Sequence, residues 1–135
     1  DRIAFADYTP DSGTAAAEAI LERIDAPPDA LFCGNDMIAF GAMTALRARG
    51  LRIPDDVVVV GFDDIPLARH AVPPLTTVRL PAAAMGEAAG RMLLAWIGGF
   101  PPDARHLTLP TELLVRASCG AAAPLPISCR RHARR

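Results

Sequence analysis

The sequence predicts an α/β fold built on a parallel, doubly wound sheet. Two short apolar runs, at 30–33 and 57–60, are uninterrupted and bounded by turn residues, as expected for strands buried on both faces of a parallel sheet. The segment between them, 36–49, has helical character, with Asp36 predicted to cap its first turn and Gly50 to end it. Parallel strands joined by a helix imply a right-handed crossover, so a ligand site is expected at the carboxyl ends of the strands.

Further elements continue the alternation of strands and helices. Upstream, the apolar stretch 3–6 predicts a strand, and the spacing of apolar residues predicts a helix from about 14 to 24. Downstream, prolines make 65–75 an irregular connection. The remaining predicted elements are an extended piece at 76–80, a helix at 82–97, and a final strand at 107–109 and 113–115 that is bent at Pro110.

Composition limits what the chain can do. Its 135 residues, 51% of them hydrophobic, suffice for one domain with a core. The formal net charge of −1 and a pI near 6.3 give no general attraction to nucleic acid or to an anionic membrane. All 14 basic residues are arginine. The chain therefore lacks the lysine of a Walker A loop, of a Schiff base or of a receiver-type phosphorylation site.

The cysteines and the apolar runs bear on the cellular compartment. Cys33, Cys119 and Cys129 are an odd number at unrelated spacings, which favours a reducing, cytoplasmic environment over a secreted disulfide framework. No apolar run is long enough to span a membrane, and no signal peptide is visible. The chain starts at Asp1 without an initiator methionine, so we expect the natural protein to continue upstream.

Polar and aromatic side chains follow the predicted strands and could meet at one edge of the sheet. Tyr8 follows the first strand, Asn35 and Asp36 the second, and Asp63 the third. An aromatic ring beside a carboxamide and a carboxylate suits a polyhydroxylated or heterocyclic ligand. Each residue also has a simpler explanation. Asp36 is better explained as a helix cap, and Tyr8 taken alone as a partly buried tyrosine, whereas binding and turn formation are equally balanced for Asn35 and Asp63.

The other candidate sites do not support catalysis. The adjacent acids Asp63 and Asp64 point to opposite sides of an extended segment, which disfavours a shared metal or glycosidase site, and Asp64 is better explained as a turn former. Cys119, Cys129 and His132 lack a fourth zinc ligand at the usual spacing. No motif of the G-x-S-x-G type supplies a nucleophile. We therefore expect no enzyme activity, no cofactor and no bound metal.

A set of motifs, in a characteristic order, adds a resemblance to this interpretation. The chain reads DYTPDSG, then ALFCGNDMIAFGAMTALRARGLRIPDDVVVVGFDD, PPLTTVRLP, MGEAAGRMLL and LPTELLVRAS. Together these motifs resemble the effector-binding domain of LacI/GalR-family transcription regulators over about 2–118. The resemblance implies a type I periplasmic-binding-protein-like fold, in which two doubly wound subdomains enclose the effector. This chain would be an incomplete copy, mostly the carboxyl-terminal subdomain.

The resemblance also assigns roles to individual residues. Tyr8 matches the aromatic residue that stacks on the effector, and Asn35 and Asp63 match polar residues that hydrogen-bond it. Domain 1–118 would be the carboxyl-terminal part of the effector-binding domain, with about 81–98 forming a helix that crosses to the largely absent amino-terminal subdomain. We expect that helix to expose its apolar stripe here, to associate through it or to pack it non-natively. The tail 119–135 is predicted to be disordered.

The resemblance implies two partners besides the effector. Its dimer-forming regions correspond to the helix at 36–49 and the loop after Asp64, so Met37, Phe40 and Met43 are predicted contacts of a homodimer. DNA would be bound only through a helix-turn-helix segment that this chain lacks. The predicted function is effector sensing, for a sugar or a nucleoside or purine, in a cytoplasmic transcription regulator. The alternative is a periplasmic sugar-binding component of an ABC transporter.

Overall fold

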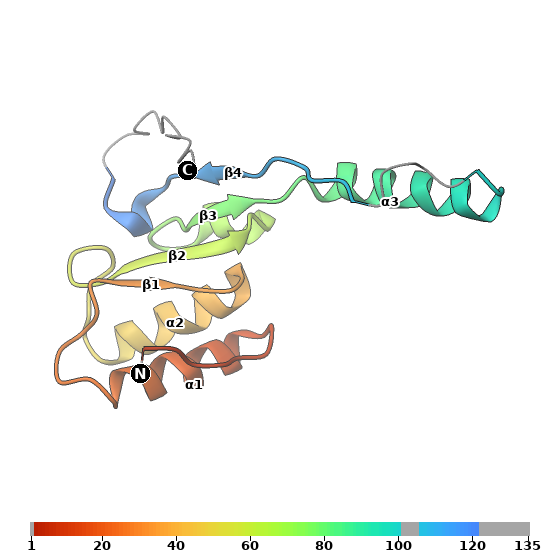
Figure 1. Cartoon of the computed structure of the whole chain (residues 1–135). Helices are drawn as coiled ribbons and strands as arrows, with labels where there is room; N and C mark the ends of the chain where they lie inside the picture. Colours follow the sequence, from red (N-terminus) through yellow and green to blue (C-terminus); the bar gives the residue numbers. More distant parts are fainter. Residues whose placement is uncertain (1, 101–105, 122–135) are drawn as a thin grey trace, which may run out of the picture.

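The computed structural model describes residues 2–100 and 106–121. It confirms an α/β fold with an open sheet (Figure 1). In chain order the elements are α1 (Pro10–Leu21), β1 (Ala30–Phe32), α2 (Asp36–Ala48), β2 (Val58–Asp63), the 3-10 helix η1 (Pro66–His70), β3 (Thr76–Arg79), α3 (Ala82–Ile97), β4 (Glu112–Leu114) and the 3-10 helix η2 (Ala117–Cys119).

The sheet is mixed but mostly parallel. Its strand order is β1-β2-β3-β4, and the first two pairings are parallel, with Leu31 opposite Val59 and Gly61 opposite Thr77. The last pairing is antiparallel, with Val78 opposite Leu113, because the chain leaves the sheet after β3 and runs back along it in β4. The predicted final strand is thus confirmed only at its second half, and 106–111 form no strand.

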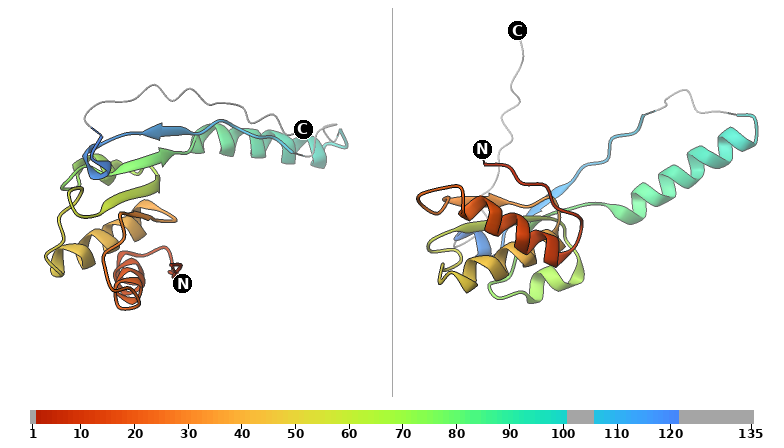
Figure 2. Two further views of the ribbon diagram at one scale, coloured as in Figure 1. Left: turned by 60° about the vertical axis from the view of Figure 1, so that its left-hand side comes forward. Right: turned by 90° about the horizontal axis from the view of Figure 1, so that it is seen from below.

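Two helices pack together on one side of the molecule. α2 lies against β2, and α1 runs along α2, as Figure 2 shows from two directions. The helices approach closely because glycine lies at the crossing on both: a Cβ atom on Gly13 would lie 2.4 Å from Ile38 O, and one on Gly41 would lie 2.0 Å from Pro10 O. Beneath them the core gathers apolar side chains that include Met43, Leu46, Val57, Val59 and Leu75.

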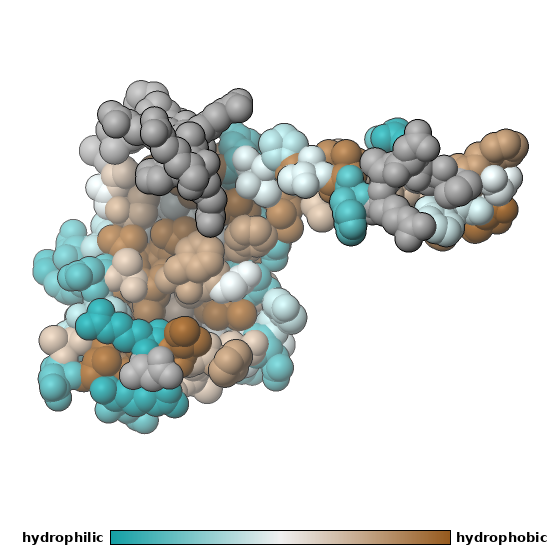
Figure 3. Space-filling model, viewed as in Figure 1, coloured by the Kyte–Doolittle hydropathy of each residue, from teal (hydrophilic) through white to brown (hydrophobic). Residues whose placement is uncertain are grey.

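α3 projects away from this body as an arm (Figure 1). Ala88 is its one buried residue, while several large apolar side chains are exposed: Met85, Leu93, Leu94, Trp96 and Ile97. Figure 3 shows apolar surface at the root and at the far end of the arm. Of the predicted apolar stripe, Met85, Leu93 and Trp96 are thus exposed, whereas Ala88 is buried. Within the described residues, no helix is long and apolar enough to cross a membrane.

Three expectations about the elements were wrong. Residues 3–6 form no strand, since no neighbouring strand completes their backbone hydrogen bonds, and Phe5 is 97% exposed. α1 begins at Pro10, four residues earlier than predicted, because Thr9 caps it and proline is tolerated at the first helical position. Asp36 does not cap α2, since Asn35 does. Of the predicted tail, only 119–121 lie within the described residues, and Cys119 ends η2.

Candidate functional site

The predicted site residues lie near the carboxyl ends of the parallel strands. Asn35 immediately precedes α2, Asp63 is the last residue of β2, and Tyr8 stands two residues before α1. Figure 1 shows that α1, α2 and α3 all begin toward this end of the sheet. The sequence prediction of a shared edge therefore holds for the backbone positions.

These side chains do not share one hollow. Asp63 lines an open hollow of about 740 Å³ at the base of α3, together with Ile65, Leu80 and Pro81. Tyr8, which is 78% exposed, lines a separate hollow of about 290 Å³ between α1 and β1. Neither hollow is lined by both residues, so each one holds only part of the predicted site.

Asn35 has a structural role that leaves part of its side chain free. Its Oδ1 accepts a 2.8 Å hydrogen bond from the Ile38 N–H, which caps α2. Asn35 is buried, with 8% of its surface exposed, and within the part of the chain that the structure describes its Nδ2 group donates no hydrogen bond. The amide therefore keeps its donor capacity while its oxygen holds the helix.

Asp36 is a fully buried carboxylate that joins three elements. Its Oδ1 accepts a 2.6 Å hydrogen bond from the Thr77 hydroxyl of β3, and its Oδ2 accepts a 2.9 Å bond from the Ile65 N–H after β2. Gly61 makes room for it, since a Cβ atom there would lie 2.3 Å from Asp36 Oδ1.

The turn after β2 has an unusual backbone. Asp63 has a φ of 109° and Asp64 a φ of 57°, although neither is glycine. Such conformations cost about 1–3 kcal/mol each and persist where the surrounding structure holds them in place. Here the Asp64 N–H donates to Thr77 Oγ1 at 3.3 Å, next to the Ile65 bond to Asp36. The strain is thus concentrated at a predicted ligand contact.

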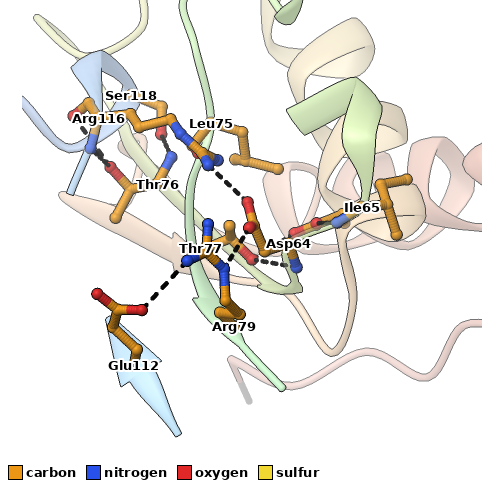
Figure 4. A network of polar contacts seen from close by, with 10 residues as sticks. Asp64, Ile65, Leu75, Thr76, Thr77, Arg79, Glu112, Arg116 and Ser118 are labelled. Carbon is orange, nitrogen blue, oxygen red and sulfur yellow. Dashed lines mark hydrogen bonds and ion pairs between the residues drawn. The ribbon is translucent and has the colours of Figure 1, made fainter. Parts of the chain in front are cut away.

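Asp64 is the centre of a charged network (Figure 4). Its side chain is only 6% exposed, with Oδ2 2.8 Å from Arg79 Nε and Oδ1 2.5 Å from Arg116 Nη2. Arg79 also pairs with Glu112 of β4 at 3.2 Å, and Arg116 donates a 2.8 Å hydrogen bond to Leu75 O. One carboxylate therefore links the turn to the strand that leaves the sheet and to the segment that returns.

The two adjacent acids have opposite electrostatic environments. Burial, and then the nearby charge of Asp36, raise the pKa of Asp63. Burial also acts upward on the pKa of Asp64, but the hydrogen bonds and charges of Arg116 and Arg79 outweigh it and leave that pKa lowered. Burial followed by the Asp36 charge likewise raises the pKa of Cys33 to about 12, so this thiol stays protonated.

The returning segment is fixed by hydroxyl groups. Ser118 Oγ accepts from the Thr76 N–H at 2.8 Å and donates to Val59 O at 2.6 Å. Thr76 Oγ1 accepts from the Arg116 N–H at 2.8 Å and donates to Arg116 O at 3.0 Å. Sequence reasoning missed these residues because their partners lie about 40 residues or more away along the chain. It also missed the network of Asp64, whose partners Arg79 and Arg116 are 15 and 52 residues away.

The three predicted dimer contacts lie at different depths. Met43 is 1% exposed and belongs to the core, so its burial leaves it no surface to offer a partner. Met37 and Phe40 are half-buried on α2. Only these two remain as candidate contacts.

The chain is similar to bacterial transcription regulators. Residues 2–119 match a family described as the periplasmic binding protein-like domain. The HTH-type transcriptional regulator MalR of Streptomyces coelicolor is 49% identical over 115 residues, which cover 85% of this chain and 33% of MalR. The lactose operon repressor of Rhizobium radiobacter is 40% identical over 108 residues, which cover 80% of this chain and 94% of that sequence.

A solved structure agrees with these relatives. The complex of the transcriptional regulator CelR with cellobiose superimposes with a TM-score of 0.79 at 42% identity, over 84% of this chain and 34% of CelR. The chain thus spans about a third of the length of MalR and of CelR.

Proposed function

Because this chain belongs to the family of periplasmic binding protein-like domains, of the kind found in LacI-type regulators, we propose that it is the effector-sensing part of a transcription regulator. The effector is a small polyhydroxylated molecule of the sugar class, with a nucleoside or purine as the other candidate. Cellobiose is the first sugar to test, since it is the ligand in the CelR complex.

The observation that supports this proposal most is the placement of Asp63. Its carboxylate stands at the end of a parallel strand, on a strained turn, and lines an open hollow. A carboxylate can accept hydrogen bonds from two neighbouring hydroxyl groups of a sugar, while the Asn35 amide donates and the Tyr8 ring covers an apolar face. Tyr8, Asn35 and Asp63 are the proposed effector contacts.

The second wall of the cleft would come from another subdomain of the full-length protein. α3 leads away from the sheet and β4 returns to it, which is the arrangement expected of a crossing between two subdomains. Docking of α3 on that subdomain would bury its exposed Leu93, Leu94 and Ile97. An effector held between the two walls then favours one relative arrangement, and operator affinity changes by its differential affinity for the two states.

The regulator is proposed to act in the cytoplasm as a homodimer, with Met37 and Phe40 of α2 among the contacts. DNA would be bound by a segment outside this chain. The relatives named above are regulators rather than enzymes or transport proteins, so the transporter alternative has no support among them.

The test is the sugar response of operator binding by the full-length regulator. Asp63→Ala should abolish the change in operator affinity on adding cellobiose, or another disaccharide that the wild type recognises, because the substitution removes the hydrogen-bond acceptor. Asp56→Ala is the control, since Asp56 pairs with Arg52 on the surface, away from the hollow. An unchanged dose response in Asp63→Ala would remove Asp63 from the site.

A further inference from the structure

The two adjacent acids at the end of β2, Asp63 and Asp64, have different surroundings. We propose that Asp64 is a positioning residue, which aims the Asp63 carboxylate at the effector through its ion pairs with Arg79 and Arg116. This inference rests on the proposed function, because it concerns how the effector-contacting group is held. From the sequence alone, Asp64 would be an ordinary turn former, for which tolerance of a positive φ is sufficient.

The side chains of Asp63 and Asp64 point in different directions. Asp64 points inward and is only 6% exposed, between two guanidinium groups at 2.8 Å and 2.5 Å. Asp63 instead lines the hollow at the base of α3. A turn former needs no ion pairs to a buried carboxylate, whereas a positioning residue does, because partners on both sides determine the orientation of its backbone.

The backbone at Asp63 is strained, so the surrounding structure must hold it in place. Asp63 has a φ of 109°, far from the left-handed value of about 57° that Asp and Asn tolerate. Backbone hydrogen bonds to Thr77 and Asp36 hold the N–H groups of Asp64 and Ile65, and the two arginines hold the Asp64 side chain. When the side-chain anchors are removed, the backbone of Asp63 is free to relax, and its carboxylate turns away.

The two arginines that pair with Asp64 come from the two segments that join the sheet to α3. Arg79 ends β3, just before the chain leaves toward α3, and Arg116 follows β4, where the chain has returned. Arg79 is also paired with Glu112. The Asp64 carboxylate therefore couples the orientation of the Asp63 side chain to both segments that connect the sheet to α3. A movement of these segments also moves the effector contact.

Two substitutions of Asp64 distinguish a positioning role from simple turn formation. Asp64→Gly fits the positive φ of 57° without strain but removes the carboxylate, and Asp64→Asn keeps a polar side chain that tolerates this φ but removes the charge. Asp56→Asn is the matched control, because it breaks a 2.8 Å ion pair with Arg52 on the surface.

The experiment measures hydrogen exchange by mass spectrometry in the full-length protein, in peptides that contain the amides of Asp64 and Ile65. We expect exchange of these amides to rise by about tenfold or more in Asp64→Gly, and less in Asp64→Asn, beyond any rise in peptides of α2 that reflects lower overall stability. Asp56→Asn should match the wild type. A rise of the same size in every peptide would indicate general destabilisation alone and would overturn the proposal, as would wild-type exchange in Asp64→Gly.

A second arm separates positioning from sugar recognition. Cellobiose binding is measured by calorimetry for the wild type, Asp63→Asn and Asp64→Gly. Loss of affinity in both variants, with increased exchange only in Asp64→Gly, supports the division of roles. Wild-type affinity in Asp64→Gly, alongside a loss in Asp63→Asn, would overturn it. If the wild type itself binds no cellobiose, cellobiose is excluded as the effector, and the exchange result still decides whether Asp64 fixes the turn.

Discussion

The Asp36 carboxylate and the Thr77 hydroxyl form a 2.6 Å hydrogen bond between two fully buried side chains, 41 residues apart. This bond joins the start of α2 to β3, and the same hydroxyl accepts from the Asp64 N–H. A helix, a strand and the turn that follows Asp63 are thus held by one polar cluster, and no local sequence pattern predicts these contacts.

Removal of the Thr77 hydroxyl should destabilise the protein. Thr77→Val keeps the shape but leaves Asp36 Oδ1 and the Asp64 N–H without a partner, at a cost of about 2–3 kcal/mol in the free energy of unfolding. Thr44→Val is the matched control, since that exposed hydroxyl bonds only to Phe40 O of its own helix. Urea unfolding of both variants checks the difference; equal midpoints would contradict a structural role for the buried cluster.

Glycine at position 61 should be required for the same cluster. In Gly61→Ala the new methyl group would meet Asp36 Oδ1 at 2.3 Å, so we expect a loss of about 1–3 kcal/mol from overpacking. Gly90→Ala in α3 has nothing within 4 Å and should instead gain up to about 1 kcal/mol from helix propensity. Opposite shifts in melting temperature are the expected result, and a loss of stability in both variants would show that the crowding around Asp36 is not the cause.

Neutralising Asp63 and neutralising Asp64 should change the stability of the protein in opposite directions. The pKa of Asp63 is raised in the folded state, so its contribution to the free energy of unfolding is present below the unfolded-state pKa of about 3.9. That contribution is lost as the pH rises through the folded-state pKa. Asp63→Asn should therefore raise the melting temperature at pH 7 by a few degrees, while weakening effector binding.

For Asp64 the sign is reversed. Its folded-state pKa is lowered, so its stabilisation is fully present above the unfolded pKa of about 3.9 and is lost as the pH falls through the folded value. Asp64→Asn should cost about 2–3 kcal/mol at pH 7, with the difference shrinking in acid. Thermal melts at neutral and acidic pH check both variants, and shifts of the same sign at pH 7 would contradict the assigned environments.

The exposed side of α2 should control self-association. Met37→Glu combined with Phe40→Glu places two charges on the proposed contact surface and should convert the proposed homodimer of the full-length protein largely to monomer. Glu18→Lys, on the exposed face of α1, changes charge elsewhere and serves as control. Sedimentation velocity gives the answer, and an undisturbed dimer in the double variant would place the interface on another surface.

The elements that the sequence predicted well are those whose signals are local. The apolar run of β2, the glycine after α2 at Gly50 and the helical spacing in α3 all produced the expected structure. Residues 3–6 did not, because strand formation depends on a neighbour as well as on apolar composition. Similarly, Asn35 and Asp36 are both competent caps, and only the position of Thr77 across the sheet decides that Asp36 turns inward.

The site was predictable in part. Positions after buried strands located Asn35 and Asp63, since the topology fixes where such residues lie. The ion pairs of Asp64 were not predictable, because its partners Arg79 and Arg116 are 15 and 52 residues away. Burial likewise separates Met43 from Met37 on the same helix, which sequence periodicity alone did not resolve.

Sugar binding by the full-length protein tests the central claim most directly. Calorimetric titration with cellobiose, lactose and maltose, on the wild type and on Asp63→Asn, should show that one sugar binds the wild type. In the variant its affinity should fall by about tenfold or more, although the variant melts higher. Equal affinity in both proteins, or a variant that loses both affinity and stability, would contradict an effector contact at Asp63.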